Sequence, residues 1–182
     1  MGKLSQAIAE GDGISILVEV EDSAGATAAQ RQGADALAAR RGLQAVRVSS
    51  QLPLLVFGTL YDASGVGADA VVIRPDLATW DEAMAHGLER VVRVTSAEDL
   101  SLALTWLDPE IFLLSVDPES DEEPVDALLA LLHDVPAGKL AIAELHDASA
   151  DEVAELERSG VDAVLVAPGD LTTLVPAEPP AV

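Results

Sequence analysis

Short runs of aliphatic residues recur along this chain, and longer stretches between them carry apolar residues at a helical period. Each run is too short for a helix and is rich in Val, Ile, Leu and Ala without polar alternation, which is typical of strands buried on both faces. The pattern predicts eight strands, at residues 14–20, 36–39, 52–57, 70–73, 90–94, 111–116, 140–145 and 163–166.

A glycine-led phrase opens three of these runs. Residues 160–163 read Gly-Val-Asp-Ala, and residues 33–36 and 67–70 both read Gly-Ala-Asp-Ala. Glycine is suited to the left-handed residue that ends a helix. The repeated order of helix, turn and buried strand therefore predicts a parallel sheet built from βα units.

Capping residues mark where several helices begin. Ser149 and Glu152 have the spacing of a capping box, and Ser96 and Thr79 are predicted to cap two earlier helices. Pro124 stands where proline is favoured, in the first turn of a helix.

Eight βα units predict an α/β fold, a closed (β/α)8 barrel of the TIM type. Such barrels usually have ~200 residues or more, so a 182-residue chain must be a compact version with short helices. The alternative is an open, doubly wound parallel sheet in which the second and third predicted strands are loops. The predicted layout is a short polar lead at 1–13, one barrel domain at 14–174 and a proline-rich tail at 175–182.

The charge balance limits the expected partners. Asp and Glu number 32 against 10 Lys and Arg, which makes the formal net charge −22. Such a surface repels nucleic acid and anionic membranes, so neither is expected as a partner. The chain has no cysteine, no signal-peptide pattern and no apolar run of ~18 residues, so we expect a cytoplasmic protein. A protein partner and a homo-oligomer both stay open, and no cofactor is expected.

The order of the segments resembles the indole-3-glycerol-phosphate synthase family, a phosphate-binding barrel of tryptophan biosynthesis. Residues 16–23, Ile-Leu-Val-Glu-Val-Glu-Asp-Ser, are similar to its first-strand motif Ile-Ala-Glu-Ile-Lys-x-x-Ser. Residues 52–58, Leu-Pro-Leu-Leu-Val-Phe-Gly, are similar to its third-strand motif Leu-Pro-Val-Leu-x-Lys-Asp. Residues 141–146, Ala-Ile-Ala-Glu-Leu-His, resemble Val-x-Ala-Glu-Ser-Gly. The resemblance runs from about residue 14 to 174 and implies a carboxy-lyase acting on a sugar phosphate.

Two lysines that the resemblance implies are missing. In the family, a third-strand lysine acts as general acid and a first-strand lysine helps to hold the substrate. Phe57 and Glu21 stand at these positions here. The chain's only lysines, Lys3 and Lys139, are placed before the barrel and at the start of a strand, away from the active-site end.

Three charged residues are the candidate catalytic positions. Glu19 and Glu144 retain family carboxylates by position, whereas Arg93 replaces a family glutamate. All three are predicted to point into the barrel near its active-site end, as a remnant catalytic site. The alternative is a buried charge cluster in which the arginine pairs with the carboxylates, because an isolated buried charge is very costly.

The candidate ligand- or phosphate-binding residues are Ser115, His146, Gly169 and Arg74. The loops after the last two strands oppose a phosphate, because Pro168 lacks an amide donor and Asp147 and Asp170 bring negative charge. No metal site is expected. His146 is interpreted as surface decoration, and the acidic segment 117–123 lacks the spacing of a calcium loop.

Three functional hypotheses remain at this level. The first is a barrel related to indole-3-glycerol-phosphate synthase that has lost catalysis and has a binding or structural role. The second is an active carboxy-lyase of tryptophan biosynthesis in which another residue supplies the proton. The third is a different barrel enzyme acting on a small anionic metabolite through Arg40, Arg74 and Arg93.

Overall fold

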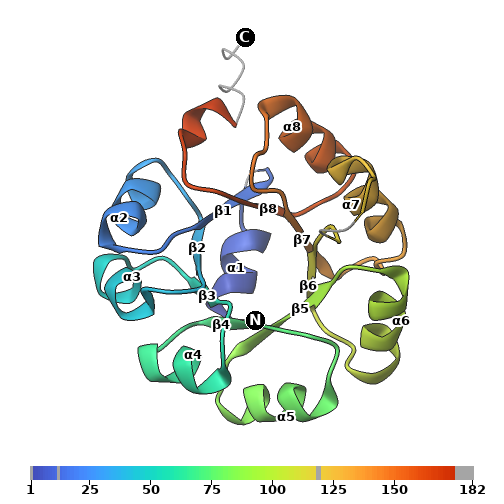
Figure 1. Ribbon diagram of the computed structural model, residues 1–182, viewed down its shortest axis with the longest axis horizontal. Coiled ribbons are helices and arrows are strands. Elements are labelled where there is room, and N and C mark those ends of the chain that lie inside the picture. Colours follow the sequence, from blue (N-terminus) through green and yellow to red (C-terminus); the bar gives the residue numbers. More distant parts are fainter. Residues whose placement is uncertain (1, 12, 118–119, 175–182) are drawn as a thin grey trace.

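The computed structural model describes residues 2–11, 13–117 and 120–174. Its eight parallel strands form a closed barrel in chain order, and β8 pairs with β1 to complete the ring (Figure 1). The predicted (β/α)8 barrel is confirmed. The open doubly wound sheet is wrong, because the second and third predicted strands do form and pair with their neighbours. None of the helices in the described ranges has the length and apolar character needed to cross a bilayer.

The helices outside the barrel are short, at seven to ten residues each. In chain order the elements are α1 Lys3–Ala9, β1 Ser15–Glu19, α2 Ser23–Arg31, β2 Ala36–Ala39, α3 Leu43–Ser49, β3 Leu54–Val56, α4 Leu60–Val66, β4 Ala70–Ile73, α5 Leu77–Ala85, β5 Glu89–Val94, α6 Ala97–Trp106, β6 Ile111–Leu114, α7 Pro124–His133, β7 Leu140–Glu144, α8 Ala150–Arg158, β8 Ala163–Val166 and the 3-10 helix η1 Leu171–Thr173.

Most of the predicted helix starts are confirmed, and one is wrong. Ser96 accepts a backbone hydrogen bond at the start of α6, and Ser149 forms the capping box of α8 with Glu152. Thr79 does not cap α5. The cap is Asp76, whose carboxylate accepts the backbone N–H and the hydroxyl of Thr79, so the helix begins three residues earlier than predicted.

The aspartate of each Gly-x-Asp-Ala phrase joins two neighbouring strands. Its backbone N–H donates to the carbonyl of one residue on the preceding strand, and its carboxylate accepts the N–H of that same residue. The carboxylate bonds are 2.8, 3.0 and 2.8 Å, for Asp35 with Ile16, Asp69 with Leu54 and Asp162 with Ala141. The phrase thus ends a helix with a left-handed glycine and sets the register of the next strand.

Two apolar cores lie on the two faces of the strands. The outer core fills the space between strands and helices and includes the outward-facing Val18, Val92 and Val164. The inner core fills the barrel with residues that alternate with these, such as Leu17, Val91 and Leu165. Alternation along each strand therefore determines which side chains can reach the two ends of the barrel.

Helix α1 closes the N-terminal end of the barrel, where it is visible inside the ring of strands (Figure 1). Its Leu4 and Ile8, four positions apart on one helix face, are buried in the inner core. Glu89 at the start of β5 accepts the backbone N–H groups of Leu4 and Ser5, at 2.7 and 3.1 Å. Residues 1–13 therefore contain more than a polar lead, and the tail 175–182 lies outside the described residues.

Candidate functional site

The C-terminal end of the barrel, here called the mouth, carries a ring of inward-facing residues. Each of them occupies the next inward-facing position of its strand after the last apolar residue of the inner core. In strand order the ring is Glu19, Arg40, Phe57, Arg74, Arg93, Ser115, Glu144 and Ala167. Active sites of TIM barrels lie at this end, so the ring is the place to look for chemistry.

Arg40 is the centre of the ring's charge network. Its Nε donates to Glu19 at 3.0 Å, and its Nη2 donates to Glu144 at 2.7 Å. The guanidinium also lies over the Phe57 ring, 3.8 Å from the ring centroid. Arg40 thus joins β1, β3 and β7 from the end of β2, and neutralises both carboxylates that the family resemblance singles out.

Glu144 is buried and fully engaged. Its side chain is 4% exposed, and one oxygen accepts the Ser115 hydroxyl at 2.5 Å and the Arg93 Nη2 at 3.0 Å. Arg93 also donates from Nε to the Ser115 hydroxyl oxygen at 2.9 Å. The structure therefore brings Glu19, Glu144, Arg93 and Ser115 into one network of paired charges, with Arg40 as a second arginine.

His146 joins this network from the loop after β7. Its Nε2 lies 3.1 Å from Oε2 of Glu19 and 4.0 Å from Oε1 of Glu144. One ligand atom from each of the three residues lies within 4.8 Å of the other two. His146 therefore faces two carboxylates at the mouth, and is not merely surface decoration.

An acidic cavity of about 410 Å³ adjoins His146. Its lining includes four acidic residues and one arginine, namely Glu123, Glu144, Asp147, Glu152 and Arg93. The Ser149 hydroxyl, which donates to Glu152, and the Ser149 backbone N–H together lower the pKa of the Glu152 carboxyl. This side of the mouth favours a cation over an anion.

Arg74 lies on the other side of Arg93. It is exposed and has no ion pair with any other described residue. Together with Arg93, Pro75, Thr95 and Asp99 it lines a separate cavity of about 290 Å³. Arg74 is thus the mouth arginine best placed to meet a ligand anion.

Two backbone donors after β8 are already bonded within the protein. At the start of η1, the Leu171 N–H donates to the side-chain oxygen of Gln32 at 3.1 Å. The next N–H, of Thr172, donates to the Asp170 carboxylate at 3.1 Å. Gly169 is exposed nearby and lines only a cavity of about 50 Å³. In phosphate-binding barrels a phosphate sits at such a helix start, whereas here protein oxygens accept both bonds.

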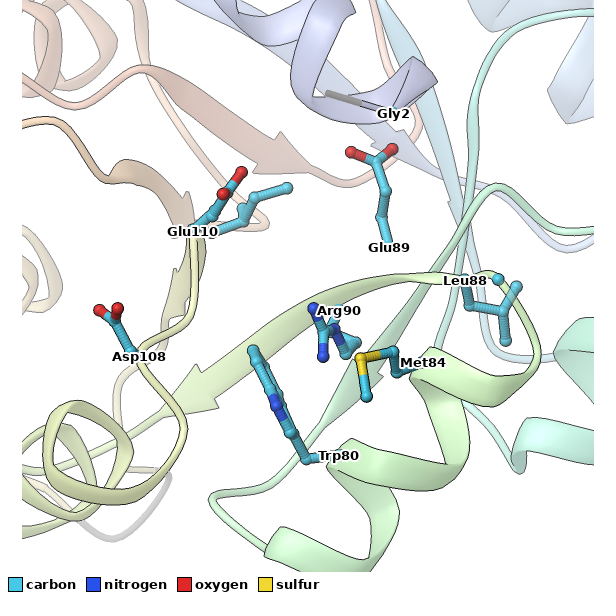
Figure 2. A pocket seen from close by; sticks show the side chains of 10 residues that line it. Gly2, Trp80, Met84, Leu88, Glu89, Arg90, Asp108 and Glu110 are labelled. Atoms are coloured by element: carbon cyan, nitrogen blue, oxygen red, sulfur yellow. The ribbon is translucent and has the colours of Figure 1, made fainter.

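A further cavity of about 370 Å³ lies at the opposite, N-terminal end of the barrel (Figure 2). Arg90 stacks over the Trp80 ring at 3.8 Å, and the Glu89 carboxylate points toward Gly2 at the start of α1. Because Glu89 holds α1 through two backbone bonds, these residues stabilise the closed end. This end of a TIM barrel is associated with stability.

The sequence indicated that Arg40 binds an anion or pairs with neighbouring acids, but it did not identify Glu19 and Glu144 as those acids. A usable signal was present, because Ala36, Ala38 and Arg40 follow the alternation that faces inward. The roles of the predicted site residues stay predictions, although the structure shows which of them meet.

Two curated proteins that are similar in sequence to this chain carry the same name. The chain is 30% identical to indole-3-glycerol phosphate synthase of Variovorax paradoxus (strain S110), over 96% of this chain and 68% of that protein. It is also 30% identical to the protein of the same name from Dechloromonas aromatica (strain RCB), over 68% of this chain and 52% of that protein. The chain thus spans about two thirds of the first relative and about half of the second. No family model matches the chain.

Solved structures resemble the chain in fold at low sequence identity. An N-acetylmannosamine-6-phosphate 2-epimerase from Clostridium perfringens has a TM-score of 0.71 and 14% identity, over 87% of this chain and 88% of that one. A thiamine phosphate pyrophosphorylase from Pyrococcus furiosus has a TM-score of 0.67 and 17% identity, over 88% and 90%. Tryptophan synthase subunit alpha from Legionella pneumophila has a TM-score of 0.68 and 12% identity, over 92% and 87%.

Proposed function

This chain belongs to the indole-3-glycerol phosphate synthase family, and we propose that it is a divergent member that has lost ring-closing decarboxylation and keeps a binding or structural role in the cytoplasm. The alternative within the family, an active carboxy-lyase of tryptophan biosynthesis, needs a proton donor at the mouth. The two proposals differ in whether such a donor is available.

The observation that carries the proposal is the position of Arg40 over Phe57. A phenyl ring has no proton to give, and an arginine guanidinium stays protonated at neutral pH. A positioned general acid is worth ~10²–10⁴ in rate. The two carboxylates at the mouth, Glu19 and Glu144, are acceptors already paired with arginines.

Substrate anchoring is weakened as well. The two N–H groups at the start of η1 donate to Gln32 and Asp170, and the Asp170 charge repels a dianion. Binding of a sugar phosphate in the family manner requires both bonds to be broken. This supports a loss of substrate binding in addition to the loss of the acid.

A small anion at Arg74 is the second candidate for the binding role. The cavity of about 290 Å³ holds Arg74 and Arg93 beside Thr95. Two of the fold relatives have names that mention phosphorylated compounds, which favours an anionic ligand for the shared barrel. Calorimetric titration with inorganic phosphate tests this candidate, with Arg74→Gln as the variant expected to lose binding and Arg41→Gln as its control.

Indole fluorescence measured on the purified protein with indole-3-glycerol-phosphate synthase substrate tests the main proposal. A relative that carries the synthase name serves as the positive control. We expect no turnover above the uncatalysed background. Turnover on the order of 1 s⁻¹ would overturn the proposal.

A second experiment distinguishes the loss of the general acid from the loss of phosphate binding. The double variant Phe57→Lys with Arg93→Glu restores two of the family residues at the mouth, and we expect it to remain inactive because the η1 donors are still occupied. Activity in this variant alone would mean that substrate binding persists and that only the acid was lost.

A further inference from the structure

We propose that Glu19, Glu144 and His146 form a binding site for one divalent transition-metal ion of the zinc class at the mouth of the barrel. The site goes beyond the proposed loss of decarboxylation and does not depend on it. It replaces the expectation from sequence that His146 takes no part in metal binding.

The three side chains have the separations that a metal requires. With metal–ligand bonds of 2.0–2.2 Å, two ligands of a tetrahedral zinc lie roughly 3.3–3.5 Å apart. Nε2 of His146 lies 3.1 Å from Oε2 of Glu19 and 4.0 Å from Oε1 of Glu144, which brackets that value. The ligand atoms of all three residues lie within 4.8 Å of one another, so small side-chain movements complete the geometry.

Neighbouring groups hold the two carboxylates in place. The Oε2 atom of Glu144 is fixed by Ser115 and Arg93, which leaves Oε1 directed toward His146 and Arg40. Glu19 uses Oε1 for Arg40 and presents Oε2 to His146. Because each carboxylate oxygen has two lone pairs, both can keep these bonds and still bind a metal. Such outer contacts orient ligands and strengthen metal affinity.

The electrostatic environment of the site must also favour a cation. Arg40 and Arg93 oppose it, but the Arg40 side chain is 38% exposed, so solvent screens part of its charge. The adjoining cavity carries Glu123, Asp147 and Glu152, and the whole chain has a formal net charge of −22. A divalent ion is therefore attracted to this side of the mouth.

The ligand set selects the kind of metal. One imidazole with two carboxylates suits zinc and similar transition metals, whereas Mg²⁺ and Ca²⁺ favour sites made of oxygen alone. Three protein ligands leave one position for water, as in open zinc sites. That open position would face the mouth.

Calorimetric titration of untagged, chelator-treated protein with ZnCl₂ tests the site, in excess Mg²⁺ to occupy scattered surface acids. Co²⁺ titration followed by visible absorption gives a second readout, since tetrahedral Co²⁺ has an intense band that octahedral Co²⁺ lacks. The variants are Glu19→Gln and His146→Ala. Their controls are Glu21→Gln, just past the end of β1, and His133→Ala, at the end of α7.

We expect one Zn²⁺ per chain and a tetrahedral Co²⁺ band, with affinity reduced at least about 10–100-fold in Glu19→Gln and His146→Ala only. Circular dichroism of each variant confirms that it is folded. Equal affinity in all four variants, or no saturable binding to the parent protein, would overturn the proposal. Because the readout is metal binding, its failure leaves the result of the indole assay unaffected.

Discussion

The guanidinium of Arg40 lies over Phe57, with its central carbon 3.8 Å from the ring centroid. Phe57 occupies the position of the lysine that the family resemblance implies, so a positive charge is still present there. It comes from the neighbouring strand, however, and it is paired with Glu19 and Glu144. Neither Phe57 nor Arg40 has a readily transferable proton at neutral pH.

Replacing Arg40 should destabilise the fold. In Arg40→Met, the buried Glu144 and the half-buried Glu19 each lose a charged donor, and we expect a loss of about 1–3 kcal/mol in the free energy of unfolding. Arg41→Met is the matched control, because Arg41 and its partner Glu21 are both exposed and solvent screens such pairs, so little change is expected. Urea unfolding followed by circular dichroism measures both. Equal losses in the two variants would contradict the central role of Arg40.

Gly42 follows Arg40 in the loop after β2, and it allows this loop to lie close to the end of β1. It has a left-handed φ of 63°, and a Cβ there would overlap the backbone carbonyl oxygen of Glu21. We expect Gly42→Ala to cost about 2–5 kcal/mol, from the left-handed backbone together with steric overlap. Gly67→Ala is the control: its φ is 67° with no atom near an added Cβ, so about 1–2 kcal/mol is expected. Similar melting temperatures for the two variants would count against a close approach at Gly42.

Asp35 should make stability fall with rising pH, opposite to the usual behaviour of an aspartate. Burial raises the pKa of its carboxyl above the ordinary 3.8, and the Ile16 N–H opposes this only in part. The folded state therefore holds its proton more tightly than the unfolded state. The favourable contribution is present below pH 3.8 and is lost as pH rises through the folded pKa.

Asp35→Asn tests this sign, because its amide oxygen can still accept the Ile16 N–H. The variant should gain stability relative to the parent protein as pH rises from acid to neutral, measured by urea unfolding. Asp76→Asn is the opposing control: hydrogen bonds from Thr79 lower the pKa of Asp76, so the parent should gain relative to that variant over the same rise. Parallel curves for parent and Asp35→Asn would contradict the prediction.

The local pattern of the sequence determined the order of elements. Alternating runs, capping boxes and the Gly-x-Asp-Ala phrase predicted eight βα units, because strand burial, helix starts and helix ends depend on residues close together in the chain. Alternation also predicted that Glu19, Arg93 and Glu144 face inward. The error at Thr79 was of the same local kind, since Asp76 is also a good capping residue and starts the helix three residues earlier.

Only the closed barrel decided which charges meet. Arg40 and Glu144 are 104 positions apart, and His146 and Glu19 are 127 apart, so no local pattern relates them. Pairing of β8 with β1 closes the ring and brings Glu144 of β7 within reach of Arg40, which also bonds Glu19. The burial of α1 in the barrel arises in the same way, because Leu4 and Ser5 bond Glu89, which is 85 and 84 positions away. The Asp35 contact is of shorter range, since Ile16 lies on the adjacent strand 19 positions away.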